Sequence, residues 1–251
     1  MNLKPALYLY KYLHLVQFDI HKALMEHKLS RISPTIKGRW LDIGAGDQPY
    51  KKYFSKADEY LTTNTKRHYC EQDFEQVDKL TTYWIEDGTV LPVDSNSLDG
   101  VACFQVLSVI EKPDEFFKEM NRVLKPGGKL LLSTDFLYPV WSKEDRYRHT
   151  SYSLEQFAES TGFNVEGIQS FGGFGSTVYS LFMRYLRSFP GIWKEKNVFT
   201  KAISAIVYLI LLLLLPIISL KGLVIYQIEK NNIRNRDFAF NNLLIAVKKT
   251  P

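Results

Sequence analysis

Two glycines follow an apolar run near residue 41, in a pattern that suits the binding of a small molecule. Residues 41–46 read Leu-Asp-Ile-Gly-Ala-Gly. Because glycine has no Cβ, Gly44 and Gly46 allow a tight turn and let a ligand approach the backbone closely. Glycine pairs after strands are also common for structural reasons alone. The turn therefore indicates a ligand site only if other polar groups lie beside it.

Three further sets of polar groups follow runs that we predict to be strands. They are Asn64, Asp87 with Gly88, and Gln105. In an open parallel sheet, ligands bind at the carboxyl ends of the strands. An adenine amine can donate to a carboxylate such as that of Asp87. Four strand ends with polar groups in sequential order predict a nucleotide-type site much more specifically than the glycines alone.

These groups need a sheet to bring them together, and the hydrophobic pattern predicts one. We expect seven strands, at 40–43, 59–63, 82–85, 98–104, 129–134, 164–170 and 241–247. Helical patterns lie at 6–30, 50–54, 113–124 and 153–160, the last capped by Ser153. Strands that alternate with helices imply right-handed crossovers. The predicted fold is α/β, a Rossmann-like doubly wound, mainly parallel seven-stranded sheet with a hydrophobic helical insertion before the last strand.

Four segments together resemble the class I S-adenosylmethionine (SAM)-dependent methyltransferases. They are 41–46, 87–92, 98–101 and 119–128, the last reading Glu-Met-Asn-Arg-Val-Leu-Lys-Pro-Gly-Gly. The resemblance covers roughly residues 38–172 and the final strand. It points to the methyltransferase-domain type found among enzymes that modify small molecules and glycans. Residues 144–150 are also similar to a subgroup with an Asp-x-x-Arg-x-Thr loop after the fifth strand.

The resemblance implies SAM as the cofactor and assigns its contacts to eight residues. The methionine part would lie on the glycine turn, against Asp42, Gly44, Ala45 and Gly46. The ribose would contact Asn64 at the second strand end, and the adenine would contact Asp87 and Gly88 at the third. Gln105 at the fourth strand end would flank the cofactor. Asn64 stands where the family usually has Asp or Glu. A charge-assisted hydrogen bond there becomes a neutral one, about half as strong.

The catalytic base is not assigned by the resemblance, because Ser108-Val109 stands where the family often has Glu-His. A hydroxyl acceptor needs a proton acceptor within hydrogen-bond reach. We predict that Asp135, directly after the fifth strand, faces the acceptor, with a helix or turn cap as the alternative. His149 is the second candidate, since imidazole titrates near neutral pH, although packing is the favoured alternative at that position. Asp145 and Arg148 are expected to pair and order their loop.

Residues 173–237 form an insertion before the last strand. They hold an amphipathic segment at 176–186 and an uncharged run at 203–220. A basic stretch runs from the end of the first segment to the start of the second, with Arg184, Arg187, Lys194, Lys196 and Lys201. About 20 apolar residues span a bilayer. A single span, however, would leave the last strand on the wrong side, and Pro216 disfavours a straight helix. We expect a monotopic or re-entrant hairpin at residues 176–228 in the cytoplasmic leaflet. The alternatives are a helix buried on the domain or in a homodimer, and a pair of spans.

Length and composition set the domain organisation. The chain of 251 residues, 45% hydrophobic and 24% charged, fits one globular domain. We divide it into an N-terminal helical cap at 1–36, a methyltransferase core at 37–172 and 238–250, and the insertion at 173–237. Cys70 and Cys103 form no Cys-x-x-Cys or Cys/His cluster. This predicts no metal site and a reducing, cytoplasmic location.

Three functions fit these observations. The first is O-methylation of a membrane-associated or lipid-linked acceptor, such as a surface-glycan sugar, by a peripheral enzyme on the cytoplasmic face of the membrane. The second is methylation of a small hydrophobic metabolite such as a quinone, against which the missing Glu-His pair counts. The third, motivated by Asn64, is a catalytically silent SAM-binding scaffold. No Asn-Pro-Pro-Tyr-like run follows the fourth predicted strand, and the basic residues cluster near the apolar run and not with aromatics along a groove, which argues against nucleic acid. A homodimer is compatible with each function.

Overall fold

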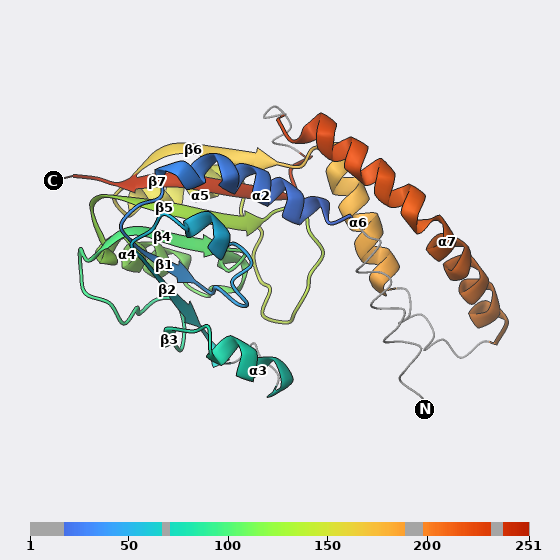
Figure 1. Ribbon diagram of the computed structural model, residues 1–251, viewed down its shortest axis with the longest axis horizontal. Helices are drawn as coiled ribbons and strands as arrows, with labels where there is room; N and C mark the ends of the chain where they lie inside the picture. The colour runs from blue at the N-terminus through green and yellow to red at the C-terminus, as the bar shows by residue number, and fades with distance from the viewer. Residues whose placement is uncertain (1–17, 67–70, 189–197, 232–237, 251) are drawn as a thin grey trace.

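The computed structural model describes residues 18–66, 71–188, 198–231 and 238–250. Its sheet has seven strands in the order β3-β2-β1-β4-β5-β7-β6 (Figure 1). β7 is antiparallel to both of its neighbours, whereas the remaining pairs are parallel. The predicted doubly wound, mainly parallel fold is confirmed. The strands are β1 (Arg39–Ile43), β2 (Glu59–Asn64), β3 (Tyr83–Trp84), β4 (Leu98–Phe104), β5 (Leu124–Asp135), β6 (Phe163–Phe171) and β7 (Asn241–Lys248).

The register of the parallel strands aligns the predicted site residues. Ile43 at the end of β1 pairs with Thr63 of β2 and with Cys103 of β4. Gly44, Asn64 and Gln105 follow these paired positions by one or two residues. They therefore lie at one edge of the sheet.

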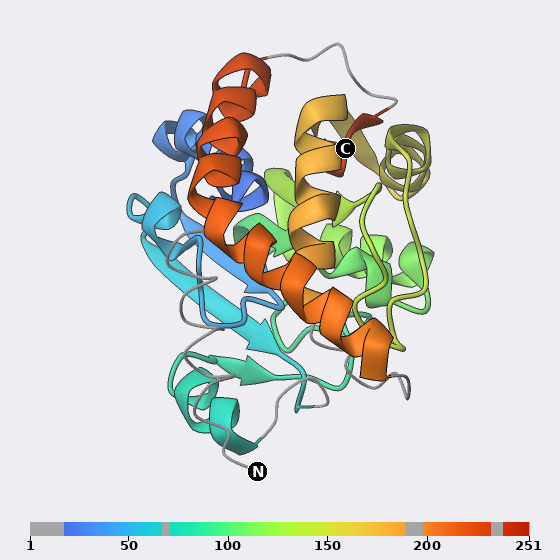
Figure 2. The same cartoon turned by 90° about the vertical axis from the view of Figure 1, so that its right-hand side faces the viewer.

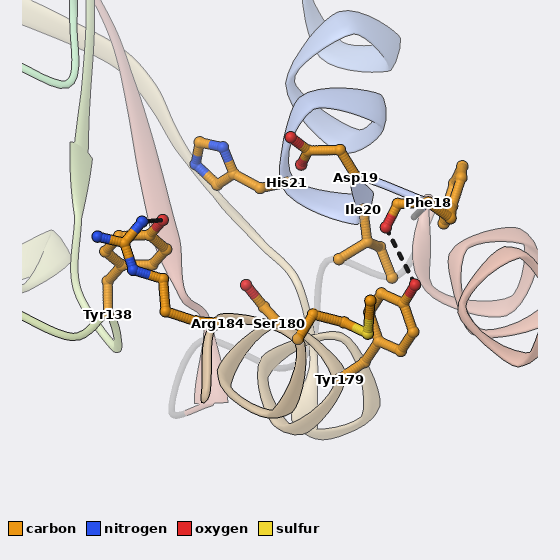
Figure 3. Close-up of a pocket in the computed structure, with 9 residues that line it drawn as sticks. Phe18, Asp19, Ile20, His21, Tyr138, Tyr179, Ser180 and Arg184 are labelled. Atoms are coloured by element: carbon orange, nitrogen blue, oxygen red, sulfur yellow. Dashed lines mark hydrogen bonds between the residues drawn. The ribbon is translucent and has the colours of Figure 1, made fainter. Parts of the chain in front are cut away.

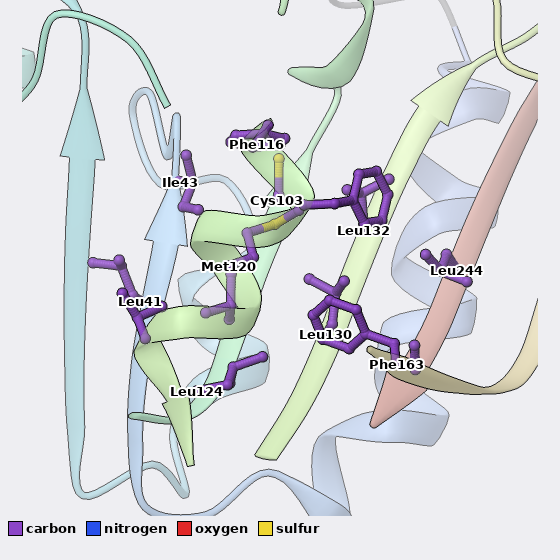
Figure 4. Packing of buried hydrophobic residues seen from close by; sticks show 14 of the residues in the cluster. Leu41, Ile43, Cys103, Phe116, Met120, Leu124, Leu130, Leu132, Phe163 and Leu244 are labelled. Carbon is purple, nitrogen blue, oxygen red and sulfur yellow. The ribbon is translucent and has the colours of Figure 1, made fainter. Parts of the chain in front are cut away.

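Helices cover both faces of the sheet. On one face, α4 (Pro113–Val123) packs over β1, β4 and β5, and α5 (Ser151–Ser160) packs beside it over β6 and β7; Figure 4 shows the buried side chains between α4 and the strands. α4 contributes the apolar residues that its spacing predicts, all fully buried: Phe116, Phe117, Met120 and Val123. Each such side chain contributes about 1.5–3 kcal/mol on burial. α2 (Ile20–Ile32) covers the other face with Leu24, Met25 and Leu29.

Some element boundaries differ from the sequence-based expectation. α2 begins at Ile20, where the Asp19 side chain accepts the Lys22 N–H, and residues 6–17 lie outside the described residues. α5 begins at Ser151 because Thr150, and not Ser153, is its cap: the Thr150 hydroxyl accepts the Ser153 N–H at 3.1 Å. Residues 50–54 hold only a short 3-10 turn, η2 (Lys51–Phe54), and the sequence pattern misses α3 (Glu71–Asp78).

The insertion folds into two helices, α6 (Phe174–Ser188) and α7 (Val198–Glu229). They lie beyond the end of the sheet to which the parallel strands point (Figures 1 and 2). α7 continues through Pro216 and buries Leu215 fully in the core shared with α2 and α6. Within the described ranges, none of the helices combines the length and apolar composition that a membrane crossing requires.

Glu229 at the end of α7 fastens that helix to the start of α6. Its carboxylate accepts backbone N–H bonds from Gly173 at 2.9 Å, Gly175 at 3.1 Å and Ser176 at 3.0 Å. The first N–H groups of a helix lack partners within it, and the helix dipole favours a negative charge there. The two helices of the insertion are therefore held together at this end by a charged cap.

We expect Glu229→Ala to lower the free energy of unfolding by about 1–3 kcal/mol, because three backbone N–H groups lose their acceptor. Urea unfolding followed by circular dichroism measures this change. Glu155→Ala, at an exposed position of α5, is the matched control and should stay within about 0.5 kcal/mol of wild type. Equal stabilities of the two variants would show that the cap is not important.

Candidate active site

A cavity of about 550 Å³ opens at the carboxyl ends of β1, β2, β3 and β4. Small-molecule sites usually have volumes of roughly 300–1,000 Å³. Among the residues that line it are five of those predicted to bind the cofactor: Gly44, Asn64, Asp87, Gly88 and Gln105. Asp42, Ala45 and Gly46 belong to the same turn but are not lining residues. The structure thus brings the four predicted strand ends together around one cavity.

Hydrogen bonds from β2 hold the glycine turn. The N–H groups of Gly44 and Ala45 donate to the Thr63 carbonyl oxygen at 2.8 and 3.2 Å. Gly44 has a φ of 70° and Gly46 a φ of 56°, a region that glycine enters without steric cost. A Cβ on Gly44 would also lie 2.5 Å from Cγ2 of Val106, another residue of the cavity wall. Both the backbone conformation and the neighbouring side chain therefore favour glycine at this position.

Asn64 takes part in holding the turn. Its side chain is 1% exposed, its Oδ1 accepts the Gly46 N–H at 2.9 Å, and its Nδ2 donates to Thr81 Oγ1 at 2.8 Å. The amide thus links the glycine turn to the segment before β3. The predicted contact with ribose hydroxyls stays a prediction, and the structure adds this positioning role, which the sequence did not indicate.

Asp42 immediately precedes the turn and is 2% exposed. The Tyr60 hydroxyl donates to Oδ2 at 2.6 Å, whereas Oδ1 has no hydrogen-bond partner in the described part of the chain. Burial raises the pKa of Asp42 to about 7, and the Tyr60 hydrogen bond acts in the opposite direction. A buried carboxylate that is only half satisfied is costly unless a donor reaches it. The arrangement therefore favours a cationic or hydrogen-bond-donating ligand group beside the turn.

The third and fourth strand ends are also constrained. Gln105 has a φ of 62°, which is uncommon for a residue with a side chain. Its Nε2 donates to Ser133 Oγ at 3.0 Å, and its buried Oε1 has no partner among the described residues. A Cβ on Gly88 would lie 2.4 Å from an aromatic ring of α4. Asp87 accepts the Thr89 N–H at 2.8 Å and faces the cavity.

Asp135, predicted as a catalytic residue, ends β5 and is 6% exposed. Asn241 Nδ2 donates to its Oδ1 at 3.2 Å, and His21 Nε2 lies 3.8 Å from the same oxygen. Burial raises the pKa of Asp135 to about 6, although the positive charge of Arg148 opposes this. Asp135 is not among the lining residues of the cofactor cavity, and its catalytic role stays a prediction.

His149, the second catalytic candidate, is packed in the interior. Its ring lies 5.8 Å from the Tyr147 ring and 5.7 Å from the Phe157 ring. Burial lowers its pKa, and Nε2 has no hydrogen-bond partner within the described ranges. The ring does not line the cofactor cavity. This environment fits the packing alternative better than a catalytic role.

The loop after β5 forms a wall of the cavity. Both terminal nitrogens of Arg148 donate to the Asp145 carboxylate, Nη1 to Oδ1 and Nη2 to Oδ2, the latter at 2.6 Å. The predicted ion pair in this loop is therefore confirmed. Trp141, Glu144 and Arg146 of this loop line the cavity, which the sequence did not indicate. Arg146 also forms an ion pair of 2.7 Å with Glu111, another lining residue. The loop is therefore tied across the cavity to the segment that follows β4.

Known proteins share this fold and its sequence motifs. Residues 41–132 match the family described as "Methyltransferase domain". A demethylmenaquinone methyltransferase of Staphylococcus haemolyticus is 25% identical over 197 residues, which cover 64% of this chain and 82% of that protein. A ubiquinone biosynthesis O-methyltransferase of Coxiella burnetii is 25% identical over 155 residues, 52% of this chain and 66% of that protein. The structure of Haemonchus contortus phosphoethanolamine N-methyltransferase 2 with SAM has 20% identity and a TM-score of 0.51, covering 88% of this chain and 51% of that one.

The sheet topology, the strand-end cavity and these matches define a class of enzyme. The matched domain and the methyltransferase relatives identify the chain as a SAM-dependent methyltransferase, and SAM is its cofactor. This assignment favours an enzyme over a silent scaffold. It does not extend to the acceptor molecule.

The cavity residues fit SAM. The molecule carries an ammonium and a sulfonium group, and Gln105 in the cavity wall has a buried Oε1 without a partner in the described residues, which offers an acceptor for positive charge. Gly44 leaves room for close approach. When bound, SAM supplies an electrophilic methyl group. The chain has to align the acceptor with that group and to take up the acceptor proton.

We expect Gly44→Ala to weaken SAM binding at least about tenfold, equivalent to about 1.4 kcal/mol, because the new Cβ would meet Val106 at 2.5 Å. Calorimetric titration with SAM and S-adenosylhomocysteine measures the affinity. Gly127→Ala is the matched control, since Gly127 has a similar φ of 79° but no atom within 4 Å of a Cβ. An affinity loss of the same size in both variants would assign the effect to backbone strain alone.

The raised pKa of Asp42 predicts a pH-dependent cost. The folded protein binds the Asp42 proton more tightly than the unfolded chain does, so stability falls as pH rises from about 4 to 7 and is then level. Asp42→Asn should therefore raise the free energy of unfolding relative to wild type by about 3 kcal/mol more at pH 8 than at pH 5, as measured by urea unfolding of the SAM-free protein.

Asp99→Asn is the control for this experiment. Burial opposes the shift, but hydrogen bonds from the Arg39 N–H and the Lys125 ammonium lower the pKa of Asp99. That variant should lose stability at pH 8. A pH-independent effect of Asp42→Asn would contradict the assigned burial cost.

Proposed function

We propose that the enzyme methylates a hydroxyl group of a membrane-associated or lipid-linked acceptor, such as a surface-glycan sugar, at the cytoplasmic face of the membrane. The observation that carries this proposal is the exposed apolar face of α7. The class of enzyme identifies SAM as the methyl donor. The exposed apolar face of α7 is the evidence for an acceptor in the membrane.

Large apolar side chains form one stripe along α7, here named the α7 stripe: Ile206, Ile210, Leu213, Ile217, Leu220, Val224 and Ile228. Steps of three or four residues place them on one side of the helix, over about 33 Å at 1.5 Å per residue. They are 51–79% exposed, while Leu215 on the opposite side is fully buried. A contiguous apolar surface of this length marks a membrane or protein contact.

The position of the stripe favours a membrane. α6 and α7 lie at the end of the molecule where the parallel strands end (Figures 1 and 2), and the cofactor cavity opens at those strand ends. An amphipathic helix lying in the membrane interface buries its apolar face among the acyl chains. An enzyme docked in this way would hold its reaction site close to an acceptor in the membrane.

One part of the sequence-based argument is corrected. Arg184 does not extend a basic face toward lipid, because its Nη1 donates to the Tyr138 hydroxyl at 3.1 Å and its guanidinium stacks over that ring. Lys194 and Lys196 lie outside the described residues. The proposal therefore depends on the apolar stripe and not on Arg184.

A quinone-like acceptor is the second candidate. The relatives from Staphylococcus haemolyticus and Coxiella burnetii carry demethylmenaquinone and ubiquinone biosynthesis in their names. A hydrophobic quinone precursor would fit the α7 stripe as well as a lipid-linked sugar would. The absence of the Glu-His pair at Ser108-Val109 counts against it.

The acceptor class is tested by transfer of a labelled methyl group from SAM into a membrane-lipid extract and, separately, into a soluble-metabolite extract of the host. We expect label in the lipid extract. Mild acid should release it in a water-soluble sugar if the acceptor is a lipid-linked glycan, and leave it in an organic-soluble product if the acceptor is quinone-like. Label confined to the soluble extract would contradict the proposal.

Membrane binding itself is tested with vesicles of phosphatidylcholine and phosphatidylglycerol. We expect the wild-type chain to sediment with the vesicles and the double variant Leu213→Gln, Ile217→Gln to bind at least about tenfold more weakly, because each apolar side chain contributes about 1.5–3 kcal/mol on burial. Tyr152→Gln, at a position 74% exposed on α5, is the control. Unchanged vesicle binding in the double variant would contradict the proposal. So would a wild-type chain that binds no vesicles but forms a dimer which dissociates in the double variant.

A further inference from the structure

The loop between β5 and α5 brings an indole ring into the wall of the cofactor cavity. Trp141 lines this cavity and is 42% exposed. An indole has a large apolar surface and a single polar N–H. Binding pockets for small molecules are commonly lined by aromatic side chains together with a few polar groups. Trp141 therefore presents an apolar ring to a ligand in the cavity.

The backbone at Trp141 is fixed by an ion pair inside the loop. Its N–H donates to Asp145 Oδ2 at 3.2 Å, and the side chain of Asp145 is 0% exposed where it pairs with Arg148. Arg148 Nε in turn donates to the Tyr138 carbonyl oxygen at 3.3 Å. The loop thus closes on itself around the Asp145–Arg148 pair. A surface that is ordered before the ligand arrives loses less entropy on binding.

The loop is also attached to neighbouring elements on both sides of Trp141. Before it, the Tyr138 hydroxyl accepts a hydrogen bond of 3.1 Å from Arg184 Nη1 of α6 (Figure 3). After it, the N–H groups of Arg146 and Tyr147 donate to the Ser108 carbonyl oxygen at 2.9 and 3.2 Å. The position of Trp141 in the cavity wall therefore follows from the fold and needs no ligand to induce it.

Charged side chains accompany Trp141 in the cavity wall. They are Glu111, Lys112, Glu144 and Arg146. Arg146 Nη1 lies 2.7 Å from Glu111 Oε1, and the two side chains are 46% and 64% exposed. A guanidinium has five N–H donors and a carboxylate about four acceptor sites, so this pair can bond to a ligand as well. A hydroxyl donates and accepts, and matches both partners. A quinone carbonyl oxygen only accepts, and cannot bond to the Glu111 carboxylate.

We propose that Trp141, Arg146 and Glu111 form a subsite for a sugar ring of the acceptor. The C–H groups on one face of the ring pack against the indole, while hydroxyls at the edge of the ring bond to the guanidinium and the carboxylate. The inference rests on the proposed function in one respect, that the acceptor is a sugar. It goes further, because it names the residues that select a sugar over a quinone-like ring.

The sheet order favours the acceptor over the cofactor as the ligand of Trp141. Along the sheet the strands run β3-β2-β1-β4-β5. The predicted adenine contacts, Asp87 and Gly88, follow β3, whereas the loop of Trp141 follows β5. At about 4.8 Å between neighbouring strands, the ends of β3 and β5 are about 19 Å apart. The loop therefore begins on the side of the sheet away from the predicted adenine position.

Sugar binding is tested without methyl transfer, by saturation-transfer NMR on the protein with S-adenosylhomocysteine. The probes are the methyl glycosides of glucose, galactose, mannose and N-acetylglucosamine. We expect at least one of them to bind the wild-type chain, with the strongest saturation on its ring C–H protons. Trp141→Ala should weaken this binding at least about fivefold, because stacking on an aromatic side chain contributes about that factor or more. Trp141→Phe should retain part of the binding.

Tyr152→Ala is the matched control, because Tyr152 is an aromatic residue that is 74% exposed on α5 and does not line the cavity. It should bind the glycosides like wild type. Binding of none of the four probes to the wild-type chain, or equal binding by Trp141→Ala, would overturn the inference.

Kinetics separate a residue that binds the acceptor from one that binds the cofactor. In the labelled-methyl assay on the lipid extract, Trp141→Ala should raise the apparent KM for the extract at least about fivefold. Its affinity for SAM, measured by calorimetric titration, should stay within about twofold of wild type. A loss of SAM affinity as large as the loss of glycoside binding would assign Trp141 to the cofactor and contradict the inference. Failure of the proposed function would appear differently, as glycoside binding without any labelled lipid product from the wild-type chain.

Discussion

The attachment of the glycine turn to β2 is the interaction on which the rest of the site depends. Three consecutive N–H groups, those of Gly44, Ala45 and Gly46, all donate to the end of β2, two to Thr63 O and one to Asn64 Oδ1. With its donors used in this way, the turn leaves the edge of the sheet clear. Gly44 lines the cofactor cavity, so these hydrogen bonds fix one part of the cavity wall.

Two buried oxygen atoms without hydrogen-bond partners in the described residues lie at the same edge of the sheet. Asp42 and Gln105 each bury an oxygen that has no partner among the described residues, and Gln105 has the backbone conformation of a glycine. Strain of this kind commonly collects at functional sites. A ligand in the cavity that donates to the buried Gln105 oxygen would gain affinity, because it relieves a cost that the free protein already bears.

The cofactor half of the site is predictable from sequence because it is local. Gly44, Asn64, Asp87 and Gln105 each follow a short apolar run, and parallel register then brings strand ends together without detailed knowledge of packing. The sequence pattern misplaces the cap of α5, because a cap depends on a single side chain, and it misses α3, because that short helix has only Phe74 and Val77 as apolar residues. Thr150 and Ser153 are equally good caps by type, and only the chain direction before α5 selects Thr150.

The acceptor half is not predictable in this way, because it depends on contacts between distant segments. His21 and Asp135 meet only because α2 crosses the end of β5, and Asn241 joins them from β7 after the whole insertion. Arg184 looked like a lipid-facing base by composition, but the packing of α6 turns it to Tyr138. The partner of a charged side chain such as Arg184 depends on the direction in which the packed helix points it. The sequence pattern alone does not give that direction.

A crystal structure of the chain with S-adenosylhomocysteine would test the central claim most directly. The account predicts the ligand in the cavity at the ends of β1 to β4, with its amino-acid part beside the turn at Gly44 and its sulfur directed toward the loop after β5. Binding at another place, or a sulfur directed away from that loop, would contradict it.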